Sequence, residues 1–290
     1  MNRHVAAVLG AGALWGFMGL FSRRLAGLGL GSAGALIVRC GIAALFFGLT
    51  LLIKDKKLFK VKLRDLWCFL GAGIMSLLFF TFCYFQAISL MSLSTAAILL
   101  YTAPAIVMVM SALIFGERLN SRSVLALVMA FAGCVLVSGL GGSVSAAGFV
   151  YGICSGLGYA LYSIFARLAL LRGYDSRTIN FYACLLCTAG AALLWGGAEP
   201  LAVMTSSVRT ALWCLATGII TCYLPYLLYT YGLTGLKTGT ASVMASVEPV
   251  VATFVGILIF REPMSFMSVC GTLLVLGAVL VLNGKRKENA

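Results

Sequence analysis

The sequence predicts an all-α integral membrane protein of ten transmembrane helices, built from two inverted repeats of five helices each. Composition predicts the membrane class, because hydrophobic residues make up 62% of the chain and charged residues 10%, against roughly 45–50% and about 25% in soluble domains. Similarity between the two halves of the chain predicts the repeats. We divide the 290 residues into a first repeat at 1–145 and a second, inverted repeat at 146–290.

Stretches without formal charge give the helices in order, because crossing a bilayer takes about 20 apolar residues. Six stretches hold one helix each: His4–Ser22, Leu25–Ile53 (interrupted by Arg39), Thr178–Ala198, Thr210–Leu236, Thr238–Phe260 (interrupted by Glu248) and Pro263–Gly284. Two longer stretches hold two helices each, with turns at Ser89–Ser94 and Leu140–Ser145: these are Leu66–Gly116 and Ser123–Ala166.

The basic residues predict the orientation in the membrane. With the amino terminus in the cytoplasm, 16 of the 21 lysines and arginines fall in cytoplasmic segments, where these residues accumulate in membrane proteins. We therefore expect both termini in the cytoplasm and the protein in the inner (cytoplasmic) membrane. The basic segment Lys54–Arg64 is either an orienting loop or a site for anionic lipid or a partner. The net charge of +13 is spread over helix ends, which argues against nucleic acid as a partner.

A shift of 145 positions aligns the two halves of the chain. The pairs that it places in register include Thr95 with Thr240, Pro104 with Pro249, Leu113 with Leu258, Glu117 with Glu262 and Ser123 with Ser268. One shift covers five helices, and because five is an odd number, the second copy is inverted in the membrane. Inverted repeats are a common architecture of secondary transporters, since exchanging the shapes of the two halves opens a central site to either face.

Two runs around the aligned prolines resemble the EamA type of the drug/metabolite transporter superfamily. They are Thr102-Ala103-Pro104 with Phe115-Gly116-Glu117-Arg118-Leu119, and Val247-Glu248-Pro249 with Phe260-Arg261-Glu262-Pro263. Trp15 and Arg39 are also similar to the family pattern, and the resemblance covers essentially the whole chain. It implies a transporter whose central cavity is lined by the first, third, fourth, sixth, eighth and ninth helices, with the fifth and tenth helices peripheral.

Glu248 is the most informative single residue, because it is the only carboxylate within a predicted span. A charge at the centre of a membrane helix costs at least about 2.5–3.5 kcal/mol on insertion scales. In one interpretation Glu248 binds and releases a proton or meets a cationic group of a substrate. In the other it forms a structural ion pair with Arg39, or a hydrogen bond to a neighbouring helix as a neutral carboxyl.

Pro104 and Pro249 lie near the middle of the spans 93–115 and 238–260, so both helices should bend at mid-membrane. Each proline is either a hinge or a packing kink, and their equal positions in the two repeats favour hinges. Aromatic residues deep in the spans complete the predicted substrate site with Glu248: Trp15, Tyr84, Tyr101, Tyr159, Tyr226 and Tyr229. Packing is the alternative role for these side chains.

The sequence predicts a secondary transporter of a small organic metabolite, such as an amino acid or an amine, working by alternating access. Export follows from the resemblance alone, and coupling to protons would act through Glu248. The alternatives are an uncoupled facilitator or an uptake permease and, less favoured, an integral-membrane enzyme or a structural partner.

The single histidine and the absence of paired carboxylates in the spans argue against an enzyme. The ten cysteines lie in apolar stretches, Cys184 and Cys187 included, so we expect no metal or cofactor. Oligomeric state stays open.

Overall fold

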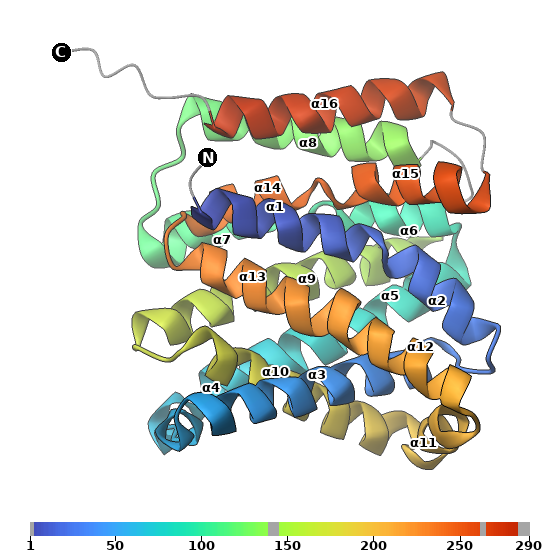
Figure 1. The fold of residues 1–290 in the computed structure, drawn as a ribbon. Helices are drawn as coiled ribbons and strands as arrows, with labels where there is room; N and C mark the ends of the chain where they lie inside the picture. Colours follow the sequence, from blue (N-terminus) through green and yellow to red (C-terminus); the bar gives the residue numbers. More distant parts are fainter. Residues whose placement is uncertain (1–2, 139–144, 262–264, 284–290) are drawn as a thin grey trace.

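A computed structural model of the protein describes residues 3–138, 145–261 and 265–283, and almost all of them are helical (Figure 1). Nine helical runs in this described part are long and apolar enough to cross a membrane, and Phe266–Leu282 is a shorter apolar helix. These helices confirm the predicted ten-helix membrane fold. The predicted turn at Leu140–Ser145, except for Ser145 itself, lies outside the described residues, as do Glu262, Pro263 and the basic run Lys285-Arg286-Lys287.

In chain order the ten membrane helices are α1 and α2 (Arg3–Gly16, Met18–Ala26), α3 (Ser32–Lys54), α4 with η3 and α5 (Leu66–Leu70, Gly71–Leu78, Phe79–Leu90), α6 and α7 (Leu93–Leu100, Ala103–Phe115), α8 (Ser121–Ser138), α9 (Ala146–Leu171), α10 (Ser176–Trp195), α12 with η4 and α13 (Val208–Gly218, Ile219–Tyr223, Leu224–Leu233), α14 and α15 (Thr238–Ala245, Glu248–Phe260), and α16 (Phe266–Asn283). The connections contain the 3₁₀ turns η1 (Lys56–Phe59) and η2 (Leu63–Asp65) and the short helix α11 (Ala198–Thr205).

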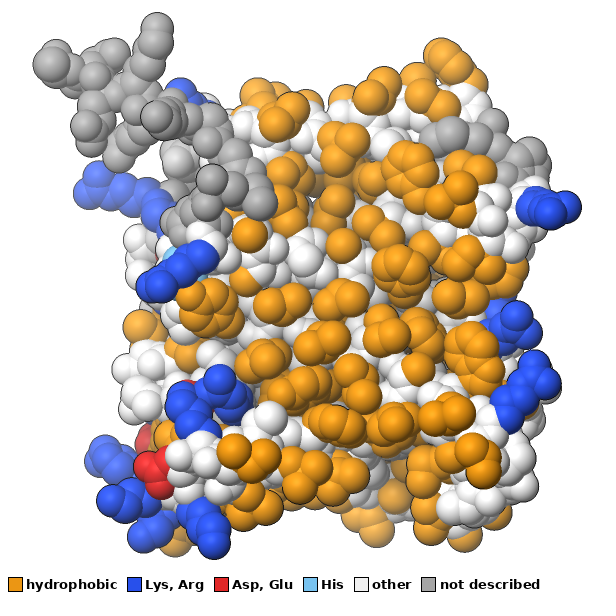
Figure 2. All heavy atoms as spheres, in the orientation of Figure 1, with side chains coloured by type: hydrophobic (Ala, Val, Ile, Leu, Met, Phe, Trp, Pro, Cys, Tyr) orange, Lys and Arg blue, Asp and Glu red, His pale blue; other side chains and the backbone are white. Residues whose placement is uncertain are grey.

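The surface has the polarity expected of a membrane protein. Figure 2 shows a broad band of hydrophobic side chains between two ends that carry the lysines and arginines. The described end of the chain at α1 lies at the same side of the bundle as the basic loop between α3 and α4 (Figure 1). We call this side the N-terminal face.

The first membrane helix extends past its predicted end at Ser22 and finishes at Ala26. The two arginines in its last turn are exposed, and each lies against an aromatic ring, a contact that favours a cation. The Arg23 guanidinium lies 4.3 Å from the centre of the Phe260 ring, and the Arg24 guanidinium lies 5.5 Å from that of Trp213. The predicted end at Ser22 was set by these two charges, which interrupt the apolar stretch.

The fourth and ninth membrane helices are each interrupted near their middle. The interruption begins four residues before the proline, because α6 ends at Leu100 before Pro104 and α14 ends at Ala245 before Pro249. A proline ring clashes with the carbonyl of residue i−4 and supplies no N–H to it, so the helix stops there. The sequence predicted a bend at each proline, and the structure has a two-residue turn just before it, at 101–102 and 246–247, whose backbone stays near right-handed helical torsions.

Glycines bring other helices close to these breaks. A Cβ at Gly12 of α1 would lie 2.7 Å from the Ala245 carbonyl oxygen, and one at Gly16 would lie 2.8 Å from that of Glu248. In the other half, a Cβ at Gly156 of α9 would lie 3.0 Å from the Leu99 carbonyl oxygen. Only glycine permits such close helix contact. Each break is therefore packed closely against the first helix of the other half of the chain.

The fifth and tenth membrane helices, α8 and α16, pack side by side as one outer layer of the bundle (Figure 1). Their contact is close, because a Cβ at Gly133 would lie 2.7 Å from the carbonyl oxygen of Gly271. Neither helix contributes a residue to the two central cavities described below. Their peripheral position agrees with what the family resemblance implies.

Candidate functional site

The two helix breaks lie on one small cavity of about 10 Å³, which we call the break cavity. Its lining residues are Leu100, Tyr101, Ala103, Pro104, Tyr159, Ser242, Ala245, Ser246 and Glu248. At each break, the carbonyl four residues before the proline, that of Leu100 or Ala245, lacks its usual helical N–H partner because proline has no N–H. Polar backbone of this kind is tolerated in a membrane where it faces protein or a wet cavity. The breaks therefore supply polar backbone at mid-membrane.

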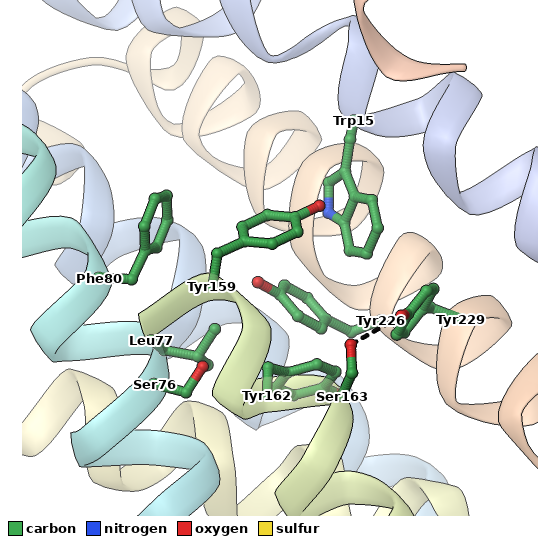
Figure 3. Close-up of a pocket in the computed structure, with 9 residues that line it drawn as sticks. All are labelled: Trp15, Ser76, Leu77, Phe80, Tyr159, Tyr162, Ser163, Tyr226 and Tyr229. Carbon is green, nitrogen blue, oxygen red and sulfur yellow. Dashed lines mark hydrogen bonds between the residues drawn. The ribbon is translucent and has the colours of Figure 1, made fainter. Parts of the chain in front are cut away.

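A second small cavity of about 10 Å³, the aromatic cavity, adjoins the first through Tyr159, which lines both (Figure 3). Its lining residues are Trp15, Ser76, Leu77, Phe80, Tyr159, Tyr162, Ser163, Tyr226 and Tyr229. The Trp15 ring lies 5.3 Å from that of Tyr226, 5.5 Å from Tyr229 and 6.3 Å from Tyr159, measured between ring centres. Together the two cavities draw on the first, third, fourth, sixth, eighth and ninth membrane helices, the six that the resemblance implies.

Glu248 is the first residue of α15, so its carboxyl lies at the amino-terminal end of a half-helix. Unsatisfied N–H groups and the helix dipole favour negative charge at this position. Sequence reasoning placed Glu248 in the middle of a continuous span and missed this compensation. The side chain is only half-buried, and the Tyr159 hydroxyl interacts with its carboxyl. Glu248 can therefore hold a proton or attract a cationic group at the cavity.

Arg39 lies apart from Glu248, on α3. Its Nη1 lies 3.2 Å from the Met18 sulfur, and its charge acts on Cys40, Cys222 and Tyr226 around it. The ion pairs among the described residues do not join Arg39 to Glu248, although the two charges still attract each other at longer range. Direct pairing of Arg39 with Glu248 stays a prediction.

A buried polar network lies under the aromatic cavity, and sequence reasoning did not foresee it. The Tyr162 hydroxyl donates to Asn180 Oδ1 and lies 2.8 Å from Thr230 Oγ1, while Asn180 Nδ2 donates to the Tyr226 carbonyl at 3.1 Å. Because buried polar groups that lack partners are costly, a satisfied network of this kind fixes its members in place. The signal available in the sequence was Asn180, an amide within an otherwise apolar span.

The structure thus gathers most of the predicted substrate-site residues around two joined cavities. Trp15, Tyr159, Tyr226 and Tyr229 line the aromatic cavity, while Tyr101 and Glu248 line the break cavity with Pro104. Tyr84 lines neither, because it packs against Phe80 at 6.0 Å and in an apolar cluster of α5, α6 and α9 side chains. Pro249 is buried beside Glu248 without lining the cavity.

Several lining residues were not predicted. Ser163 lies one helical turn after Tyr159, and its hydroxyl lies 2.7 Å from that of Tyr229 (Figure 3). Ser246 lies in the second break, and Ser242 lies one helical turn before it. Aromatic and charged groups stand out in an apolar sequence, whereas small hydroxyl residues do not. Their place at the cavity depends on the break itself.

The described residues contain no group of three or more histidine, cysteine or carboxylate side chains placed to hold a metal ion. Cys184 and Cys187 are buried free thiols in the helical core. The polar groups that the cavities offer are hydroxyls, backbone amides and one carboxyl. Such a lining can bind an organic solute.

The model of the EamA-like transporter family matches the chain twice, at residues 3–139 and 146–284. The chain belongs to this family. An uncharacterized transporter of Archaeoglobus fulgidus is 32% identical over 198 residues, which are 68% of this chain and 70% of the relative. The transporter YxxF of Bacillus subtilis, also described as uncharacterized, is 26% identical over 82% of this chain and 76% of its own. A crystal structure with 19% identity has a TM-score of 0.78 over 96% of both chains and shares the fold.

In this EamA-like transporter, Glu117 joins the two halves at the N-terminal face. Gly116 ends α7 in the left-handed conformation, with φ of 65°, and turns the chain toward α14. The N–H of Thr238 then donates to Glu117 Oε1 at 2.7 Å, and the N–H of Gly239 donates to Oε2 at 3.2 Å. The residue before α14, Lys237, provides no side-chain cap. Glu117 therefore caps a half-helix that belongs to the other half of the chain.

Proposed function

We propose that this membrane transporter exports a small organic solute with a cationic group, an amino acid or an amine, across the cytoplasmic membrane. The observation that carries the proposal is Glu248 beside an aromatic lining, with Tyr159 common to both cavities. A carboxylate attracts a cation, and aromatic faces add attraction once water is displaced. Each cavity has room for about one water molecule, at about 10 Å³, so in this proposal the two cavities widen when a solute binds. The direction of transport rests on the family resemblance.

We propose that the two halves, 1–145 and 146–290, are inverted and exchange conformations during transport. Three features that recur between the halves support this: a broken helix before Pro104 and Pro249, a π-helical segment in the third and eighth membrane helices, and a glycine against each break. The breaks act as the hinges, because they have the fewest helical hydrogen bonds to lose on bending.

We place the N-terminal face, with both termini, in the cytoplasm because of the distribution of basic residues. Glu117 then closes the cytoplasmic side of the carrier by holding α7 to α14. Opening toward the cytoplasm separates these two elements and releases the Glu117 carboxyl from the two N–H groups.

The test is solute counterflow in proteoliposomes that contain the purified protein, with a panel of amino acids and amines. We expect counterflow of at least one cationic or zwitterionic solute, and its loss in Glu248→Gln. The matched control is Glu199→Gln, which makes the same chemical change at an exposed site on α11. Counterflow that is equal in Glu248→Gln and the wild type would remove Glu248 from the mechanism.

A second measurement separates proton coupling from direct solute binding. We expect an imposed pH gradient to drive net solute movement in the wild type. If Glu248 carries the proton, Glu248→Gln loses gradient-driven transport but keeps counterflow. If it binds the solute, the variant loses both. Wild-type solute flux that does not change with the pH gradient would indicate an uncoupled facilitator.

A further inference from the structure

A basic pocket of about 410 Å³ opens on the N-terminal face, away from the two central cavities. Five side chains line it: Lys62, Arg64, Asp65, Trp67 and Arg172. Figure 2 shows lysines and arginines gathered at the lower left, at the α4 end of the molecule, with acidic side chains among them. Three cations and one carboxylate leave the pocket with a net positive charge.

The one carboxylate in the pocket is already fully engaged. Asp65 forms an ion pair with Arg172, with Nε 3.2 Å from Oδ1, and accepts a hydrogen bond from the Tyr174 hydroxyl at 2.8 Å. Arg172 in turn donates from Nη1 to the Leu168 carbonyl at 3.1 Å, and its guanidinium lies 4.8 Å from the Trp67 ring centre. Asp65 therefore fixes Arg172 at the pocket wall and leaves part of the guanidinium for another ligand.

The other two cations of the pocket are exposed. The ion pairs of the described residues include neither Lys62 nor Arg64. The backbone of this segment is nevertheless anchored, because the Lys62 N–H donates to the Tyr174 hydroxyl at 3.1 Å. The pocket thus presents two cations without a carboxylate partner beside one fixed guanidinium, an arrangement that favours an anion with several oxygens, such as a phosphate.

Apolar surface continues directly from the rim of the pocket. Leu63 is 85% exposed, Leu171 62%, Leu70 45% and Trp67 43%. Leucine side chains are stable in the acyl region of a bilayer, and tryptophan is enriched at the interface. A free anion would leave this apolar surface unused, whereas a phospholipid contacts both parts.

We propose that this pocket binds the phosphate headgroup of an anionic phospholipid of the cytoplasmic leaflet, with the acyl chains along the exposed side chains of α4 and α9. The inference uses the proposed orientation of the N-terminal face and is independent of what the carrier transports. It assigns the lipid to three residues of a pocket, which differs from a general attraction to the whole basic loop.

The test measures thermal stabilisation of the purified protein by phosphatidylglycerol against phosphatidylcholine in mixed micelles, with lipid adducts counted by native mass spectrometry. The pocket variant is Lys62→Gln with Arg64→Gln. The matched control is Lys56→Gln with Lys57→Gln, which removes two charges from the same loop at residues that do not line the pocket. Arg172 is left intact because it supports Asp65.

We expect phosphatidylglycerol to stabilise the wild type and the control. A basic residue near an anionic membrane contributes about 1 kcal/mol, so losing two should weaken binding on the order of 30-fold. Equal weakening in both variants would overturn the pocket assignment in favour of diffuse attraction. The absence of a phosphatidylglycerol preference in the wild type would overturn the site altogether. Equal stabilisation by millimolar inorganic phosphate would assign the pocket to a free anion and overturn the lipid.

Discussion

Removing the carboxyl of Glu117 should loosen the start of α14 without unfolding the protein. The perturbation is Glu117→Ala, which takes the acceptor away from the Thr238 and Gly239 N–H groups. Glu117→Gln is the milder change, because the amide oxygen can still accept from one of them. Both variants leave the hydrophobic contacts of α7 and α14 in place.

The magnitude follows from what Glu117 does as a helix cap. Loss of an N-cap side chain costs about 0.5–2 kcal/mol, and loss of a negative charge at a helix amino terminus costs about 0.3–1 kcal/mol more. Lys237 cannot compensate, since it makes no side-chain cap. We therefore expect local opening of α14 to become easier by about 1–3 kcal/mol in Glu117→Ala, or roughly 5- to 150-fold in exchange rate. Glu117→Gln should show about half of this free-energy change.

The assay is hydrogen–deuterium exchange by mass spectrometry on peptides that cover 238–245. The control is Glu199→Ala on α11, whose exposed carboxylate has no hydrogen bond among the described contacts. Exchange in 238–245 that stays at the wild-type rate in Glu117→Ala, with the fold intact, would refute the role of Glu117 as a cap. Faster exchange throughout the protein would show global destabilisation instead and would refute the local argument.

Two further predictions concern packing and pH. Gly133→Ala should destabilise the protein by about 1–3 kcal/mol, because the new methyl meets a carbonyl oxygen of α16 at 2.7 Å; Gly19→Ala, with no atom within 4 Å, should not lower the melting temperature. At Asp175, desolvation opposes ionisation, but the Arg177 N–H and Lys54 outweigh it and lower the carboxyl pKa below its ordinary value of 3.8. Its contribution to stability is therefore present above that pH and lost as the pH falls further, so the melting temperatures of wild type and Asp175→Asn should converge in acid.

Either prediction can be contradicted by a simple result. Equal melting temperatures for Gly133→Ala and the wild type would mean that α8 and α16 separate without cost. A constant difference between Asp175→Asn and the wild type from pH 6 down to pH 3 would mean that the Asp175 carboxylate contributes nothing through its charge.

The sequence predicted the ten helices because length and hydrophobicity suffice to define a membrane span. It also located the breaks to within a few residues, since proline acts on the carbonyl of residue i−4 by local sterics. The first helix is longer than predicted, and Arg23 and Arg24 in its last turn contact Phe260 and Trp213, which are distant in sequence. Such contacts depend on the packed bundle and leave no local pattern.

The candidate site was predictable only in part, because side chains that look alike in the sequence meet different neighbours in the packed bundle. Trp15, Tyr159 and Glu248 stood out as large or charged groups at mid-span, and they line the cavities. Tyr84 has the same appearance in the sequence, yet it points to a different apolar cluster. Which face of a membrane helix meets the cavity is decided by helix packing, because lipid and protein interior are similarly apolar and periodicity is weak.

The glycine contacts at the breaks have a mechanical consequence. Gly12 and Gly16 bind α1, and with it Trp15, to the backbone on both sides of the second break, where Glu248 begins α15. Gly156 binds α9, and with it Tyr159, to the first break beside Tyr101. In the proposed exchange of conformations, Trp15 therefore moves with Glu248, and Tyr159 moves with Tyr101. A solute bound between these pairs contacts both moving parts in that proposal, so its contacts change with each exchange.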